Sequence, residues 1–276
     1  MAGVGGTQRT AIPTVRLPTG EPIPVLGQGT HGDTPDSAHR RREIAALRAG
    51  LDLGLTLIDA VAGAEPLVGE AIVRRRDDVF LVARLPAHQA TRRGMVAACA
   101  ASARRLGTEM LDLYLLQGRG PIPLEETIQG FEALREAGMI RHWGVAGFSL
   151  PALAELYIVT ANCAAAEVRY DLERRAAEWD LLDRCRERGL PVLASTPMEL
   201  RGHPRLAELA ARHEATPSQV ALAWLLSHEG LVAITPSEHP EQVAEHRAAV
   251  ELQLDGHDHA MLDEAFPPPL GPQPLE

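Results

Sequence analysis

Eight short apolar segments alternate along the chain with stretches of helical periodicity, and this alternation predicts a (β/α)8 barrel. The chain has 276 residues, and barrels of this class commonly run to about 250 residues as one domain. Hydrophobic residues make up 45% of the chain and aromatic residues only 4%, so the core must be built from Leu, Val, Ile and Ala. We therefore expect residues 1–276 to form a single barrel domain.

A small hairpin is expected before the barrel begins. Residues 1–10 have the composition of a disordered leader, and the apolar segments 15–17 and 22–26 then flank a turn-like Pro-Thr-Gly-Glu cluster. Such a hairpin could plug the bottom of the barrel.

The expected strands are apolar runs that stop abruptly at polar or glycine residues. The densest is Leu-Asp-Leu-Tyr-Leu-Leu at 111–116, which has the length and content of a fully buried parallel strand. The eight expected strands cover residues 27–30, 56–58, 79–85, 111–116, 142–146, 164–168, 191–194 and 231–234.

Each expected strand is followed by helical sequence with recognisable ends. Thr91 and Thr216 can cap the starts of two helices, and Gly138 and Gly189 can end two others. The expected helices cover residues 37–53, 65–75, 91–106, 123–137, 151–159, 179–188, 205–213, 217–227 and 240–249, followed by a terminal helix and proline-rich tail at 255–269.

Charge and cysteine usage narrow the classes of function. The net charge of −10 argues against a nucleic-acid binder, which needs a basic face. No signal peptide and no apolar run of about 18 residues is evident, so we expect a cytoplasmic protein without a membrane partner. Cys99, Cys163 and Cys185 are far apart and suit small core residues in a reducing compartment, and neither they nor the histidines have the spacing of a metal site.

Charged and polar residues follow several of the expected strands. In parallel barrels the carboxyl ends of the strands carry the side chains that meet substrate. The residues in question are His31, Asp59, Arg84, Gln117, Arg119, Glu167 and Arg169. Burying several charges is costly unless they form ion pairs or take part in catalysis. Their presence favours a functional pocket at this end of the barrel.

The chain resembles the aldo-keto reductases, and most closely their bacterial branch. The resemblance extends over almost the whole length. It is carried by LPTGEPIPVLGQGT, EIAALRAGLDLGLTLIDA, LVGEAI, ATRRGMVAACAASARRLGTEMLDLYLLQGRG, GFEALREAGMIRHWGVAGF, EWDLLDRCRERGLPVLA and ATPSQVALAWLL.

The resemblance implies hydride transfer from a nicotinamide cofactor to a carbonyl, with a tyrosine as proton donor assisted by a lysine, an aspartate and a histidine. Only the aspartate is matched, by Asp59. The loop at 60–64 has no tyrosine, Arg84 stands at the lysine position and Gln117 at the histidine position. Arginine stays protonated at working pH and glutamine does not titrate, so we expect the reductase proton donor to be absent.

The positions at which the family holds its cofactor also differ. They are Ala146 and Gly147, Ala166 and Glu167, Ser195, residues 235–237, Gln242, and Glu245 with His246. Only Glu245 and Ser237 survive from the family's pattern. Each lost charge-assisted contact to phosphate is worth roughly 1.5–3 kcal/mol, so we expect NADP to bind weakly and no cofactor to be required.

These observations predict a cofactor-independent, non-redox enzyme that uses acid–base catalysis on a small-molecule intermediate, by dehydration, isomerisation or cyclisation, in specialised metabolism. A carboxylate or His31 would move the proton, and Arg84 or Arg119 would hold an anion or oxyanion. The expected catalytic set is Asp59, Arg84, Glu167, His31 and Gln117, and the expected substrate-binding set is Arg119, Arg169 and Thr196.

Other interpretations stay open at this point. Asp59 and Arg84 can be a plain structural ion pair, and Arg119 a solvated loop charge. The barrel can be a catalytically silent binding or regulatory protein. A third possibility is an NADP-dependent oxidoreductase with an altered cofactor mode.

Overall fold

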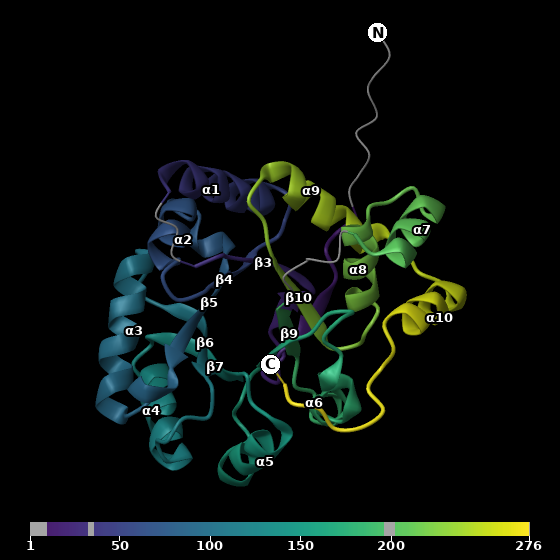
Figure 1. Ribbon diagram of the computed structural model, residues 1–276. Helices are drawn as coiled ribbons and strands as arrows, with labels where there is room; N and C mark the ends of the chain where they lie inside the picture. Colours follow the sequence, from purple (N-terminus) through teal and green to yellow (C-terminus); the bar gives the residue numbers. More distant parts are fainter. Residues whose placement is uncertain (1–9, 33–35, 196–201, 276) are drawn as a thin grey trace.

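The computed structural model describes residues 10–32, 36–195 and 202–275 and forms a closed barrel of eight parallel strands (Figure 1). The expectation of a (β/α)8 barrel is confirmed. The strands run in chain order around the barrel, and β10 pairs with β3 to close it. They are β3 (Leu26–Gly29), β4 (Leu57–Ala60), β5 (Phe80–Pro86), β6 (Leu111–Gln117), β7 (Ile140–Ala146), β8 (Ala166–Arg169), β9 (Val192–Ser195) and β10 (Leu231–Pro236).

Alternation along the strands fills two layers of core. On β6, Leu113 and Leu115 point into the barrel, whereas Tyr114 and Leu116 pack outward against the helices. The antiparallel hairpin β1 (Thr14–Arg16) and β2 (Pro22–Pro24) adds to the inner layer. Its Ile23 is fully buried among the inward-facing residues, and this confirms the expected plug.

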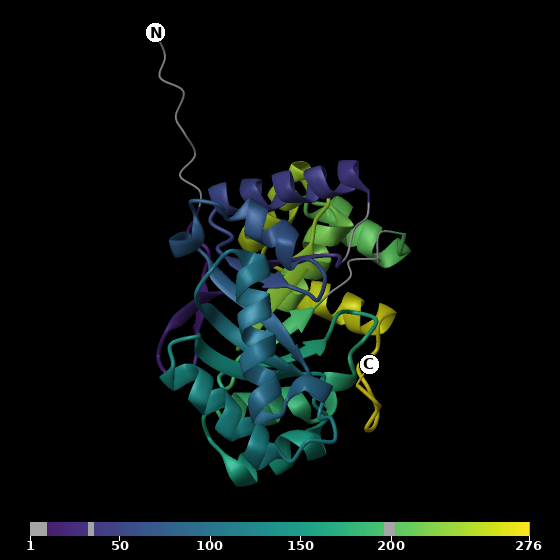
Figure 2. The same cartoon turned by 90° about the vertical axis from the view of Figure 1, so that its left-hand side faces the viewer.

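The helices surround the barrel, and Figure 2 shows α3 on its outside, in front of the strands. They are α1 (Ser37–Asp52), α2 (Glu65–Ala71), α3 (Arg92–Leu106), α4 (Leu124–Glu136), α5 (Leu150–Val159), α6 (Leu181–Glu187), α7 (Pro204–Arg212), α8 (Pro217–Leu226), α9 (Pro240–Ala248) and α10 (Gly256–Ala265). Short 3₁₀ turns cover Arg76–Asp78, Ala87–Gln89, Ala176–Trp179 and Ala249–Glu251.

The expected caps are present, and helix α2 ends several residues earlier than predicted. The Thr216 side chain and Gln219 form a capping box at α8. The terminal helix α10 stops at Ala265 and the expected proline-rich tail follows it, because prolines after Phe266 disfavour helical backbone before them. By contrast, α2 ends at Ala71 instead of residue 75, and Arg74 beyond it adopts a φ of 64°.

Among the described residues, none of the helices combines the length and the apolar character needed to cross a membrane.

Gly144 on β7 is a packing constraint in the barrel wall. A Cβ built there would lie 2.3 Å from the backbone oxygen of Ala165. We expect Gly144→Ala to destabilise the fold by about 1–3 kcal/mol, because backbone cannot swing aside as a side chain can. Gly256→Ala is the matched control, since a Cβ there meets nothing within 4 Å. Chemical denaturation would measure both variants, and equal stability of the two would contradict the expectation.

Candidate active site

A hollow of about 270 Å³ opens at the carboxyl ends of the strands, where barrel enzymes place their chemistry. Its charged lining comes from three strands: Asp59 on β4, Arg84 on β5, and Glu167 with Arg169 on β8. We call this space the mouth hollow. These four residues therefore lie where the sequence predicted them, at the carboxyl ends of the barrel strands.

Arg84 bridges two buried carboxylates at the mouth. Its Nη2 donates to Asp59 Oδ2 and to Glu167 Oε1, each at 2.6 Å. The side chains of Asp59, Glu167 and Arg84 are 2%, 4% and 12% exposed, so water screens the cluster weakly. Asp59 and Arg84 thus form the ion pair that the sequence left open, and Glu167 makes it a three-membered cluster.

The cluster holds two carboxylates against one guanidinium, and its electrostatics follow from that imbalance. Burial, together with the charge of Asp59, raises the pKa of Glu167 to about 7, although Arg84 opposes the shift. Burial lowers the pKa of Arg84, but Asp59 and Glu167 outweigh it and raise that pKa above its ordinary value. Near neutral pH, Glu167 can therefore hold or release a proton while Arg84 stays charged.

Three buried polar atoms of the cluster have no hydrogen-bond partner within the described part of the chain. They are Asp59 Oδ1, Glu167 Oε2 and Arg84 Nε. Buried polar groups are normally satisfied, so these atoms leave two acceptor positions and one donor position for a bound group. Thr30 keeps the adjoining rim in place: its hydroxyl donates to the Asp59 carbonyl and accepts from the Val61 amide.

A second, larger cleft of about 710 Å³ lies between α2 and α3 and also touches Arg84. Gly63, Pro66, Pro86 and Ala98 contribute to its walls. Arg84 is a lining residue of both spaces, whereas its partners Asp59 and Glu167 line only the mouth hollow.

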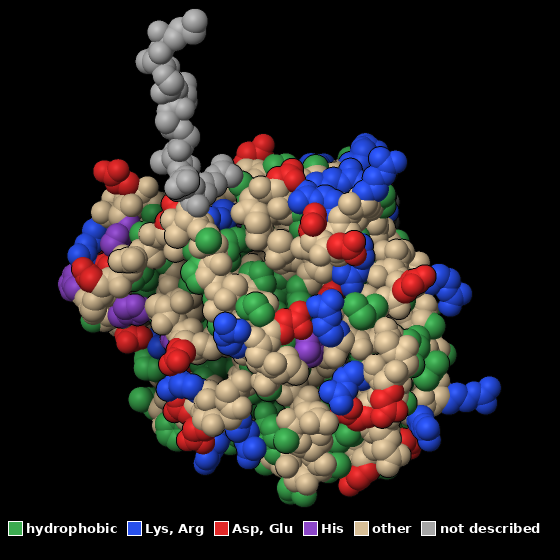
Figure 3. All heavy atoms as spheres, turned by 180° about the vertical axis from the view of Figure 1, so that it is seen from behind, with side chains coloured by type: hydrophobic (Ala, Val, Ile, Leu, Met, Phe, Trp, Pro, Cys, Tyr) green, Lys and Arg blue, Asp and Glu red, His purple; other side chains and the backbone are tan. Residues whose placement is uncertain are grey.

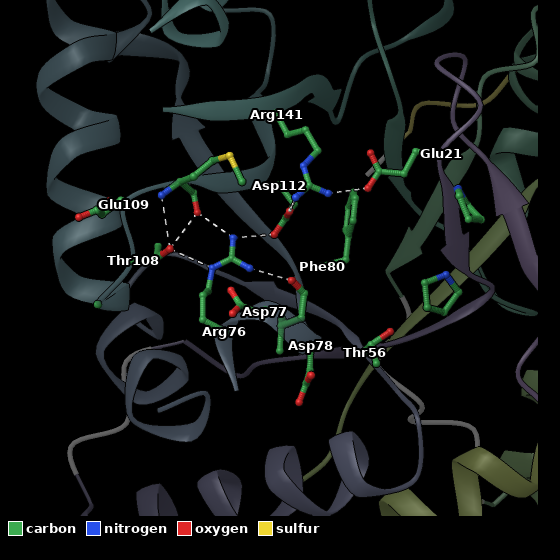
Figure 4. Close-up of a pocket in the computed structure, with 15 residues that line it drawn as sticks. Glu21, Thr56, Arg76, Asp77, Asp78, Phe80, Thr108, Glu109, Asp112 and Arg141 are labelled. Carbon is green, nitrogen blue, oxygen red and sulfur yellow. Dashed lines mark hydrogen bonds and ion pairs between the residues drawn. The ribbon is translucent and has the colours of Figure 1, made fainter. Parts of the chain in front are cut away.

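The opposite end of the barrel carries another cleft of about 710 Å³, shown in Figure 4. Its charges pair with one another: Arg76 Nη2 donates to Asp112 Oδ2 at 2.7 Å, and Arg141 pairs with Glu21 and Asp112. The Thr108 hydroxyl accepts from Arg76 Nε at 2.9 Å. Because this is the amino-terminal end of the strands, we assign the network to stability rather than chemistry.

Not every residue of the expected site joins the cluster. Gln117 is exposed at the end of β6 and lines neither the mouth hollow nor the α2–α3 cleft. Arg119 donates through Nε and Nη2 to Glu155 on α5, and its Nη1 braces the loop carbonyls of Gly120 and Ile122. Thr196 lies outside the described residues.

Surface ion pairs like that of Arg119 with Glu155 are common in this protein. Figure 3 shows acidic and basic side chains interspersed over much of one face of the molecule. Arg169 is exposed at the end of β8 and is the basic group of the mouth hollow that remains open to solvent.

His31 lies beyond β3 and faces helix α1 rather than the cluster. Its backbone amide donates to Glu43 Oε1 at 3.0 Å, and its Nδ1 lies 3.4 Å from the same oxygen. Hydrogen bonding to Glu43 raises the pKa of His31. Sequence reasoning missed Glu43, which is fully buried on α1. The sequence feature that could have pointed to Glu43 is His39, which lies four residues earlier and therefore on the same helix face.

The tyrosines of the chain do not supply a proton donor at the mouth. All three, Tyr114, Tyr157 and Tyr170, are absent from the lining of the mouth hollow. Tyr114 lines the α2–α3 cleft but packs edge-on against Phe131 outside the barrel, and burial raises its pKa. The chain also contains no lysine.

Comparison with known proteins decides the family. The model of the Aldo/keto reductase family matches residues 25–202 and 196–266. The chain belongs to that family. It is 39% identical to the methylglyoxal reductase YeaE of Escherichia coli over 269 residues, which cover 92% of this chain and 95% of the relative.

Solved structures of the family agree. An aldo-keto reductase from Klebsiella pneumoniae in complex with NADPH is 38% identical with a TM-score of 0.92, and the match covers 97% of this chain and 99% of that one. A second structure from that organism, in complex with NADP and acetate, is 37% identical with a TM-score of 0.90, covering 95% and 98%.

These relatives contradict the predicted non-redox function. Proteins that match almost the full length of this family member are named reductases, and one is bound to NADPH. The prediction of a cofactor-independent lyase, isomerase or cyclase is therefore wrong. That prediction inferred a changed reaction type from changed side chains at the strand ends, and the near-full-length similarity to named reductases overturns it.

Proposed function

We propose that this protein is an oxidoreductase that interconverts a small carbonyl compound and its alcohol with a nicotinamide cofactor, at the mouth of the barrel. The observation that carries the proposal is the Asp59–Arg84–Glu167 cluster, which offers a proton, a fixed positive charge and unpaired polar atoms at the rim. Membership of the reductase family and the similarity to a methylglyoxal reductase support it.

The nicotinamide end of a cofactor fits the residues at the mouth. A carboxamide carries N–H donors, and Asp59 Oδ1 is a buried acceptor without a partner among the described residues. Glu167 would face the substrate oxygen, and Arg84 would hold Glu167 in place. When bound, the nicotinamide supplies or accepts the hydride.

The phosphate of NADP fits the chain poorly. The resemblance places this phosphate near residues 235–246. Gln242 there is neutral, and Glu238 and Glu245 are acidic. Ser237 Oγ lies 3.1 Å from His246 Nδ1, and Glu245 accepts from the Thr216 hydroxyl at 2.6 Å. Arg247 is turned toward the Thr10 carbonyl and Glu251. A carboxylate such as Glu238 suits ribose hydroxyls better than a phosphate dianion.

The chain's own residues can complete a carbonyl reduction. Arg84 Nε, a buried donor without a partner in the described chain, can hydrogen-bond to the carbonyl oxygen and stabilise the negative charge that develops on it. The same oxygen must gain a proton, which Arg84 cannot give because its raised pKa keeps it charged. Glu167, with its pKa near 7, can give that proton from Oε2.

Activity of Glu167→Gln tests this role. We expect methylglyoxal reduction by the variant to have a kcat about 100-fold or more below wild type, since positioned proton transfer contributes on that scale. In the wild type, kcat should fall as pH rises above about 7, because Glu167 then loses the proton that it donates.

The control variant is Glu155→Gln, which removes a carboxylate that pairs with Arg119 on the outer surface. It should keep wild-type turnover. Full activity of Glu167→Gln, or absence of turnover by the wild type with aldehydes and either NADH or NADPH, would contradict the proposal.

Cofactor preference follows from the acidic residues around the expected phosphate position. We expect NADH to bind more tightly than NADPH in fluorescence titrations, by about 10-fold, which corresponds to about 1.4 kcal/mol. Glu238→Arg should shift the preference toward NADPH, because it replaces a carboxylate with a phosphate-binding guanidinium. Tighter binding of NADPH by the wild type would refute this part of the proposal.

A further inference from the structure

A second group of chemically active side chains lies beside the first barrel strand, apart from the mouth cluster. Glu43 on α1 is a fully buried carboxylate, His39 lies one turn before it on the same helix, and His31 approaches from the end of β3. None of these three residues lines the mouth hollow. Their nitrogen and oxygen atoms lie within 4.8 Å of one another.

Two of the separations are near the edge length of a metal coordination tetrahedron. His31 Nδ1 lies 3.4 Å from Glu43 Oε1, and His39 Nε2 lies 3.7 Å from Glu43 Oε2. With zinc–ligand bonds of about 2.0–2.1 Å, neighbouring ligand atoms of a tetrahedral site are about 3.3–3.4 Å apart. The two imidazoles face different oxygens of Glu43, so side-chain adjustment is needed to bring all three residues onto one ion.

The buried atoms of this group need a partner that the described part of the chain does not supply. Glu43 Oε2 and His39 Nε2 are both buried without a hydrogen bond in the described chain, and their 3.7 Å separation is too long for one. The described ion pairs of Glu43 are with His31 and His39, not with an arginine. A cation between these atoms would satisfy both and neutralise a carboxylate that is costly to bury.

A carboxylate also lies on the far side of the His39 ring. While Nε2 faces Glu43, the other ring nitrogen, Nδ1, lies 3.8 Å from Glu238 Oε2. A ligating histidine commonly directs its second nitrogen toward a carboxylate, which orients the ring and raises its basicity. Glu238 is near because α9, which follows it, lies beside α1 (Figure 1).

We propose that His31, His39 and Glu43 form a binding site for a divalent cation of the zinc class. Two imidazoles and one carboxylate are ligands that Zn²⁺ accepts, and three protein ligands leave a position for water. The ion would tie the end of β3 to α1. The sequence spacing predicted no metal because His31 and Glu43 belong to different elements, twelve positions apart, and only the fold brings them together.

Titration calorimetry of the metal-free, untagged full chain with ZnCl₂ tests the proposal. We expect one equivalent to bind with a dissociation constant in the micromolar range or below. His31→Gln and His39→Gln should each weaken binding at least about 10-fold, since even outer partners of metal ligands change affinity by about 10- to 100-fold. His257→Gln, which alters an exposed histidine on α10, should bind as the wild type does.

Cobalt provides a second readout and keeps the test independent of activity. Co²⁺ at this site should give the intense visible absorption of tetrahedral coordination, and both histidine variants should lose it. The His31 side chain is one-third exposed, so His31→Gln carries the test if His39→Gln, at a less exposed position, prevents folding. Absence of binding, or equal binding by wild type and both histidine variants, would mean that the histidines only balance the charge of Glu43 and would overturn the proposal.

Discussion

Parallel closure of the barrel, completed by the pairing of β10 with β3, is the constraint on which the rest of the structure depends. Because all eight strands run the same way, their carboxyl ends form one rim. The interior below is filled by aliphatic side chains and by the hairpin residue Ile23. Charged groups from distant parts of the sequence can therefore meet at the rim, and Arg84 and Glu167 do so across 83 positions of the chain.

The proposed function depends on the balance of charge among Asp59, Arg84 and Glu167 at the rim. One guanidinium cannot fully compensate two buried carboxylates, so the pKa of Glu167 rises to about 7 and its carboxyl group can hold or release a proton near neutral pH. Arg84 supplies a permanent charge beside it. Under the proposed function, the same rim would supply both the proton and the oxyanion stabilisation without tyrosine or lysine.

Much of the fold follows from local sequence, whereas the site follows only in part. Apolar runs such as 111–116 define strands because burial on both faces demands them, and barrel topology then predicts that Asp59, Arg84 and Glu167 meet. Arg119 could not be assigned in this way, because its partner Glu155 is set by the placement of α5. Burial of Glu43 likewise depends on packing around α1. The predicted reaction type was wrong because side-chain identity at single positions does not fix the chemistry of a whole rim.

The protonation state of Glu167 is the most direct test of the account. Infrared difference spectra between wild type and Glu167→Gln, recorded from pH 4 to pH 10, would isolate the carbonyl stretch of a protonated carboxyl group. The account predicts a band that persists at pH 6 and disappears with a midpoint of about 7. A carboxyl group that is fully ionised by pH 5 would contradict it, since Glu167 could then not serve as the proton donor.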